Sequence, residues 1–171
     1  KHLDCITAKL REMGAKVTEY DDAIRVEADH RLRRSNVKTM PYPGFPTDMQ
    51  PQIAVCMALA EGTSLVTEGI YDNRFRYTAE LNRMGASIQV ESKTAVIDGV
   101  TQLHGCEVRA CDLRAGAAMV IAALCAEGTT TIEDAHYIER GYEDIIGKFS
   151  AIGGKIRRIE TFEGNSQSAA G

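Results

Sequence analysis

Five residues of this chain, two aspartates and three arginines, have the side chains best suited to catalysis or ligand binding. Asp48 and Asp112 stand at expected helix starts, where a carboxylate can cap the helix or accept a proton from a substrate. Because a helix N-terminus also weakens a carboxylate as a base, both roles of Asp48 stay open. Arg74, Arg114 and Arg140 carry guanidinium groups, which suit phosphate or carboxylate. The set predicts a site for an anionic ligand.

No other group of residues forms a catalytic pattern. His136 lies near Glu133 and Asp134, but the spacing matches no metal-ligand pattern, so no metal is expected. The cysteines have no evident activating base, and Cys56 and Cys125 lie in apolar runs where a thiol behaves as a small hydrophobic group. No P-loop or GxGxxG segment occurs, so nucleotide cofactors bound in those ways are not expected.

Both aspartates open the same sequence pattern, which indicates an internal repeat. The segments TDMQPQIAVCMALAEGT (47–63) and CDLRAGAAMVIAALCAEGT (111–129) each place an aspartate before small and apolar residues that end in Ala-Glu-Gly-Thr. A strand-like run follows, then a second helix that ends in a glycine turn. The turn glycines Gly14, Gly85 and Gly153 recur at intervals of about 70 residues. In the two complete copies, Arg74 and Arg140 are expected at the start of this second helix.

The hydrophobic pattern predicts the elements that position these residues. One helix is framed by Asp48 as a potential N-cap, by Pro51 in its first turn and by Gly62 at its end, and the proline-rich loop 38–46 should hold Asp48 in place. The apolar run 113–126 predicts a helix buried on all sides. Three helices with charged and apolar residues in alternation should cover an outer surface, and they end at Met13, Met84 and Ile152. Alternating or β-branched runs predict strands at 16–20, 24–27, 64–68, 87–91, 95–98, 107–110, 129–133 and 155–159.

Each complete unit therefore reads strand, helix, strand, helix, strand, strand. This order predicts an α/β (α+β) fold of pseudo-symmetric βαβαββ repeats. We expect one domain over 1–160, with a partial repeat at 1–40 and complete repeats at 41–105 and 106–160. Since the first copy shows only its second half and the sequence does not begin with Met, the chain is expected to be part of a longer polypeptide. The small polar segment 161–171 is predicted to be a disordered tail.

Composition narrows the classes of function. The 171 residues are 44% hydrophobic and 26% charged, which is ordinary for a globular protein in water. The net charge of −4 provides no bulk attraction for nucleic acid, and no apolar run is long enough for a membrane span. The five cysteines are odd in number and form no Cys-x-x-Cys pair. The cysteine pattern indicates a reducing cytoplasm. From the charge and the lack of a long apolar run, we expect neither nucleic acid nor a membrane as a partner.

The ordered series of motifs resembles the enolpyruvyl transferase family over residues 1–160. The matching segments are YPGFPTDMQPQ (42–52), AEGT (60–63), DNRF (72–75), LNRMGA (81–86), DLRAGAA (112–118) and ERGYE (139–143). The resemblance implies the family fold, an inside-out α/β barrel of two pseudo-threefold domains with the active site between them. By the same resemblance, this chain corresponds to most of the domain that contains the C-terminus.

The resemblance also implies a reaction and a set of site residues. The enolpyruvyl group of phosphoenolpyruvate would pass to the 3-hydroxyl of UDP-N-acetylglucosamine, the first committed step of peptidoglycan synthesis, with no metal or organic cofactor. Asp48 would bind the sugar hydroxyl and act as the base, the backbone of Ile70 would contact the nucleotide sugar, and Arg140 would reach phosphoenolpyruvate when the domains close. The implied substrate-binding residues are Asp48, Ile70, Arg74, Asp112, Arg114 and Arg140.

Some of the family's active site has no counterpart in this sequence. The family's mobile loop with a cysteine general acid, its Lys-Asn pair and a further arginine are not found here, so we expect no turnover from the chain alone. Three alternatives remain open at this stage. One is the shikimate-pathway enolpyruvyl transferase, which shares the fold and uses another acceptor. Another is a non-catalytic repeat module, and the third is an RNA-end-processing enzyme, which the acidic balance disfavours.

Overall fold

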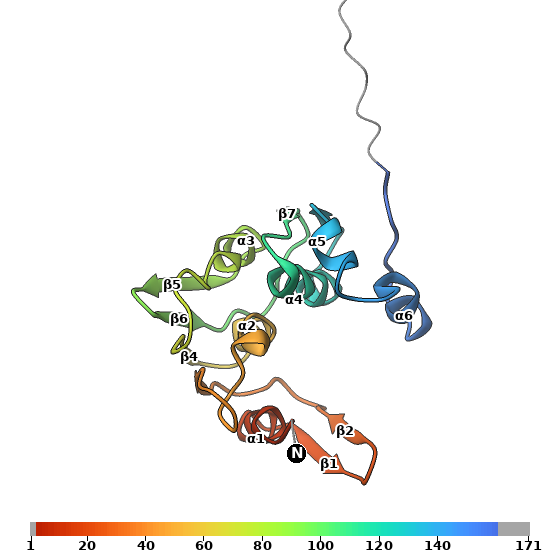
Figure 1. The fold of residues 1–171 in the computed structure, drawn as a ribbon. Coiled ribbons are helices and arrows are strands. Elements are labelled where there is room, and N and C mark those ends of the chain that lie inside the picture. The colour runs from red at the N-terminus through yellow and green to blue at the C-terminus, as the bar shows by residue number, and fades with distance from the viewer. Residues whose placement is uncertain (1–2, 161–171) are drawn as a thin grey trace, which may run out of the picture.

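Two helices lie side by side in the middle of the molecule, α2 (Gln50–Ala58) and α4 (Leu113–Cys125) (Figure 1). The computed structural model describes residues 3–160, so the predicted tail 161–171 lies outside the described residues. Both helices are rich in small and apolar residues, and most of their side chains are buried. Helices of this kind must pack on several sides, which explains their central place.

The largest sheet contains four strands and lies against α2. Its order is β3-β4-β6-β5, formed by β3 (Asn36–Lys38), β4 (Thr63–Thr67), β5 (Ser87–Glu91) and β6 (Thr94–Asp98). Strands β3 and β4 are parallel because α2 crosses over between them, whereas β4–β6 and β5–β6 are antiparallel pairs. The helix α3 (Tyr77–Arg83) connects β4 to the β5–β6 hairpin. This unit has the predicted βαβαββ order.

The second unit repeats the first half of this arrangement. Strand β7 (Glu107–Arg109) pairs in parallel with β8 (Thr131–Glu133), and α4 crosses over between them as α2 does between β3 and β4. Two short helices follow, α5 (His136–Glu139) and α6 (Ile145–Ala151). The two equivalent crossover helices, α2 and α4, are formed by the two copies of the sequence repeat.

The N-terminal part contains one helix and one hairpin. Helix α1 (Asp4–Glu12) precedes the antiparallel pair β1 (Lys16–Glu19) and β2 (Ile24–Glu27), and all three lie at the bottom of the view in Figure 1, below α2. Within residues 3–160, no helix has the length and the apolar composition that a bilayer span needs.

The predicted glycine turns are confirmed at all three positions. Gly14, Gly85 and Gly153 follow α1, α3 and α6, and their φ angles are 102°, 96° and 94°. This left-handed region is strained for residues with a Cβ, which explains why glycine recurs after each outer helix. The two parallel strand pairs with their helical crossovers confirm the α/β fold class, while the boundaries drawn between the repeats stay a prediction.

Three details of the predicted secondary structure are wrong. No strand forms at 155–159, because no other described strand lies beside this segment to pair with its backbone. Strand β3 was not predicted, since three residues are too few to show an alternating pattern. Helix α4 is not buried on all sides, because Leu124 and Cys125 in its last turn are exposed. The other seven predicted strands form, with ends shifted by at most two residues.

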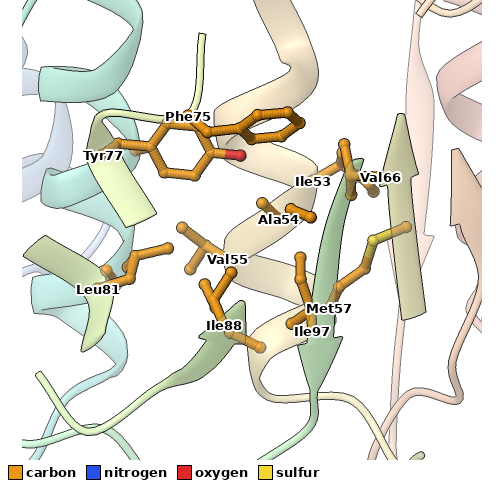
Figure 2. Close-up of a cluster of buried hydrophobic side chains, with 14 of the residues drawn as sticks. Ile53, Ala54, Val55, Met57, Val66, Phe75, Tyr77, Leu81, Ile88 and Ile97 are labelled. Carbon is orange, nitrogen blue, oxygen red and sulfur yellow. The ribbon is translucent and has the colours of Figure 1, made fainter. Parts of the chain in front are cut away.

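The main core lies between α2 and the four-stranded sheet. Figure 2 shows side chains of α2 facing those of the sheet and of the segment that leads into α3. The buried residues labelled there are Ile53, Ala54, Val55, Met57, Val66, Phe75, Tyr77, Leu81, Ile88 and Ile97. This core fixes the ends of β4 and the start of α2, where the candidate site residues lie.

Replacing Ile97 with valine tests the packing of this core. Ile97 is fully buried, and Figure 2 shows it among Val55, Met57 and Ile88. The removed methylene leaves a small cavity, so Ile97→Val should lower the free energy of unfolding by about 0.5–1.5 kcal/mol in urea denaturation. Ile24→Val is the matched control, because Ile24 is also in a strand but is 39% exposed. Equal effects of the two changes would contradict the packing described here.

Candidate functional site

Asp48 and Arg114 form an ion pair that joins the starts of the two central helices. The Arg114 Nε donates a hydrogen bond to Asp48 Oδ1 at 2.7 Å, although the two residues are 66 positions apart. The side chain of Asp48 is 60% exposed and that of Arg114 is 36% exposed, so a ligand can reach both. The hydrogen bond to Asp48 raises the pKa of Arg114 above its usual value, so Arg114 stays charged.

The two aspartates play different structural roles. Asp112 is the N-cap of α4, and its Oδ1 accepts hydrogen bonds from the backbone N–H groups of Arg114 at 2.8 Å and Ala115 at 2.9 Å. Asp48 lies in the 3₁₀ helix η1 (Thr47–Met49), and the N-cap of α2 is Met49.

The capping role considered for Asp48 is therefore wrong. The 3₁₀ turn that precedes α2 gives the N-cap position to Met49, and neither helix start receives a side-chain capping bond. The Asp48 carboxylate is directed to Arg114 instead. Because its oxygens are not held by the backbone N–H groups of a helix, Asp48 is the aspartate available to a substrate.

The loop before Asp48 closes on itself, in agreement with a positioning role. Thr39 and Phe45 form a parallel β-bridge, and the Met40 N–H donates to the Phe45 carbonyl at 3.0 Å. Phe45 is only 5% exposed and belongs to the main core, so it anchors the loop. The Tyr42–Pro43 peptide bond within the loop is cis.

Glu68 is the residue of this region that sequence reasoning missed. It follows β4 directly and is 2% exposed, and its carboxylate accepts hydrogen bonds from five donors in three segments. The donors are Thr39 Oγ1, Thr47 Oγ1, Gln50 Nε2, Ile70 N and Tyr71 N. Burial alone would raise the pKa of Glu68, but the hydrogen bonds from Thr39, Ile70, Thr47 and Tyr71 together hold it below its usual value. The available signal was an acidic residue directly after a strand-like run.

Ile70 stands in the loop that Glu68 organises. Its backbone N–H donates to Glu68 Oε1 at 2.8 Å, so this donor is already used within the protein. A backbone contact between Ile70 and a ligand would therefore go through the carbonyl oxygen of Ile70, which accepts hydrogen bonds from donors such as amides or hydroxyls.

Arg74 and Arg140 are each held by a tyrosine three residues earlier in the chain. The guanidinium carbon of Arg74 lies 4.5 Å from the ring centroid of Tyr71, and that of Arg140 lies 5.6 Å from the ring of Tyr137. Such cation–π contacts orient a guanidinium and leave its charge uncompensated. Within residues 3–160, neither arginine forms an ion pair. Both can therefore receive an anion.

The expected placement of these arginines at helix starts is wrong. Arg140 is the C-cap of α5, and Arg74 lies in the turn before α3, whose N-cap is Arg76. A cation at a helix C-terminus is favourable with the helix dipole, so the placement of Arg140 creates no strain. The structure brings Asp48, Asp112 and Arg114 together. Among the described residues, Arg74 and Arg140 form no hydrogen bond or ion pair with any of these three.

The cysteines show no sign of an activated thiol. All five are free, and burial raises the pKa of Cys56, Cys111 and Cys125 above the usual value of a thiol. Across residues 3–160, no three side chains of His, Cys, Asp or Glu gather as metal ligands would.

A family model matches most of the chain. The model of EPSP synthase (3-phosphoshikimate 1-carboxyvinyltransferase) matches residues 1–149. Among curated proteins, UDP-N-acetylglucosamine 1-carboxyvinyltransferase 3 of Caldanaerobacter subterraneus subsp. tengcongensis is 56% identical over 158 residues, which is 92% of this chain and 38% of the relative. UDP-N-acetylglucosamine 1-carboxyvinyltransferase 1 of Carboxydothermus hydrogenoformans is 51% identical over 93% of this chain and 38% of its own length. The chain thus spans little more than a third of these relatives.

Solved structures agree with this assignment. The enolpyruvyl transferase NikO from Streptomyces tendae superimposes with a TM-score of 0.84 and 32% identity, over 91% of this chain and 36% of NikO. EPSP synthase from Acinetobacter baumannii gives a TM-score of 0.56 at 18% identity over 71% of this chain and 30% of its own, which shows the shared fold. The motifs, the repeat geometry and these matches lead to one conclusion: the chain belongs to the EPSP synthase family of enolpyruvyl (carboxyvinyl) transferases.

Proposed function

We propose that this chain is part of an enzyme that transfers the enolpyruvyl group of phosphoenolpyruvate to the 3-hydroxyl of UDP-N-acetylglucosamine. The observation that carries the proposal is the identity of 56% over 92% of the chain with a relative named UDP-N-acetylglucosamine 1-carboxyvinyltransferase. We place the reaction in the cytoplasm, as the first committed step of peptidoglycan synthesis and so in support of cell shape and division. The free state of all five cysteines supports that location.

The chemistry of the step calls for a base and for anion-binding groups. The sugar hydroxyl forms a C–O bond to C2 of phosphoenolpyruvate while C3 gains a proton. This gives a tetrahedral intermediate, which then loses phosphate and a proton from C3. A neutral hydroxyl adds faster when a base takes its proton, and Asp48 is the exposed carboxylate suited to that role. Arg114 must release Asp48, or share it with the hydroxyl, when the sugar binds.

The arginines provide the complement to the charged substrates. Phosphoenolpyruvate carries a phosphate and a carboxylate, which guanidinium groups bind with paired hydrogen bonds. Arg140 is assigned to phosphoenolpyruvate, and Arg74, Asp112 and Arg114 to the lining of the same cleft, completed by a second domain. The carbonyl of Ile70 is assigned to the nucleotide sugar, since its N–H is used by Glu68.

The choice of acceptor can be tested directly. The full-length enzyme should release phosphate from phosphoenolpyruvate when UDP-N-acetylglucosamine is present and remain inactive with shikimate 3-phosphate. The second acceptor is the relevant competitor, because the matching family model is described as 3-phosphoshikimate 1-carboxyvinyltransferase. Activity with shikimate 3-phosphate alone would overturn the choice of acceptor. No turnover with either acceptor would favour a non-catalytic binding module.

A further inference from the structure

Glu68 is a buried carboxylate whose negative charge is stabilised without a cation. Within residues 3–160 it forms no ion pair, and its five partners are hydroxyl, amide and backbone N–H donors. A charge at 2% exposure is costly to bury unless hydrogen bonds satisfy its oxygens. The donors come from three separate segments of the chain, so their positions show what this carboxylate holds together.

The two oxygens of Glu68 hold two different segments. Oε1 accepts from Ile70 N at 2.8 Å and Tyr71 N at 3.2 Å, and from Thr39 Oγ1 at 2.7 Å. Thr39 Oγ1 in turn accepts from the Gly69 N–H at 2.8 Å, which closes the loop from a second side. This loop carries the backbone of Ile70 and the tyrosine ring that lies against Arg74.

The other oxygen holds the turn that carries Asp48. Oε2 accepts from Thr47 Oγ1 at 2.9 Å and from Gln50 Nε2 at 3.3 Å, and these residues flank Asp48 on both sides. One carboxylate thus connects the turn with the aspartate to the loop with Ile70. The two segments have no other hydrogen bond to one another among the described residues.

We propose that Glu68 is a positioning residue that fixes Asp48 relative to the loop of Ile70 and Arg74, so that a nucleotide sugar held by the loop presents its hydroxyl to the base. The inference rests on the proposed function, which assigns those two roles. Catalysis depends on placement at this scale, because a small displacement of a base from its substrate proton lowers the rate strongly. Glu68 itself is not assigned any contact with the substrate.

Two threonine variants of the full-length enzyme separate the halves of this arrangement. Thr47→Val removes the shorter of the two hydrogen bonds between Glu68 and the turn of Asp48, and it should lower kcat about ten- to hundredfold with little change in KM for UDP-N-acetylglucosamine. Thr39→Val removes the hydrogen bond from the Gly69 N–H and the one to Glu68, which loosens the loop and should raise that KM about ten- to hundredfold with less change in kcat. Thr63→Val is the matched control, since the Thr63 hydroxyl also donates to a carboxylate, Asp98, at 2.6 Å but outside the site.

The outcomes distinguish a role of Glu68 in positioning the site residues from a role in the stability of the whole protein. Glu68→Ala should show both kinetic effects, and if it does not fold, the threonine variants decide the matter. The proposal is overturned if Thr47→Val and Thr39→Val lower only the melting temperature and otherwise behave as Thr63→Val. No turnover by the wild type would refute the proposed function instead. In that case hydrogen exchange is decisive, and wild-type exchange rates at the amides of Ile70 and Tyr71 in Glu68→Gln, together with a wild-type rate at the amide of Gly69 in Thr39→Val, would overturn the positioning role.

Discussion

Asp48→Asn should lower the kcat of the full-length enzyme about 10²- to 10⁴-fold, the range expected when a general base is lost. The asparagine keeps the size of the side chain and can still accept one hydrogen bond from Arg114, but it cannot take a proton from the sugar hydroxyl. Phosphate release at saturating substrates measures the effect. KM for both substrates should change much less than kcat, because the missing step is proton removal and not binding.

The stability of the protein should hardly respond to the same change. The Asp48–Arg114 pair is partly exposed, and such pairs contribute about 0–1 kcal/mol. A large loss of kcat with a nearly unchanged melting temperature therefore separates a catalytic role from a structural one. Asp98→Asn is the control, because Asp98 is an exposed carboxylate on β6 that accepts a hydrogen bond from one hydroxyl, that of Thr63 on β4. Near-normal turnover of Asp48→Asn would show that another group removes the proton.

The sequence allowed us to predict interactions between residues that are close to one another along the chain. The cap of α4 follows from Asp112 and the two N–H groups that come directly after it, and the glycine turns follow from local backbone strain. The same reasoning gave the wrong geometry at Asp48. There, an extra 3₁₀ turn moves the N-cap by one residue, from Asp48 to Met49, and no pattern in the sequence marks this turn.

Contacts between distant segments could not be predicted in this way. The pairing of Asp48 with Arg114 depends on how α2 and α4 pack, and the five hydrogen bonds of Glu68 depend on three loops that meet at one end of the sheet. Segment 155–159 shows the opposite case, in which a suitable pattern has no neighbouring strand among the described residues. A strand-like pattern shows that a segment is able to form a strand, but the strand forms only where packing places a partner strand beside it.

The placement of Arg140 leads to a second large effect. Its guanidinium lies 5.6 Å from the ring of Tyr137 and has no carboxylate partner among residues 3–160, so its charge is available to a ligand. Loss of charge-assisted hydrogen bonds to a bound anion costs roughly 2–4 kcal/mol, which corresponds to about 30- to 1,000-fold. Arg140→Ala should therefore lower kcat/KM for phosphoenolpyruvate by that factor and leave KM for UDP-N-acetylglucosamine nearly unchanged.

Two further variants test whether the loss of activity comes from the guanidinium group of Arg140. Arg140→Lys keeps the charge but lacks the planar fork, so it should recover only part of the activity. Arg158→Ala is the control for loss of a nearby exposed arginine, because Arg158 pairs with Glu139 at 3.3 Å and has no assigned contact with substrate. If Arg140→Ala and Arg158→Ala have equal kinetics, the phosphoenolpyruvate contact does not belong to Arg140. The alternative is then Arg74, whose uncompensated guanidinium is held against Tyr71 in the same way.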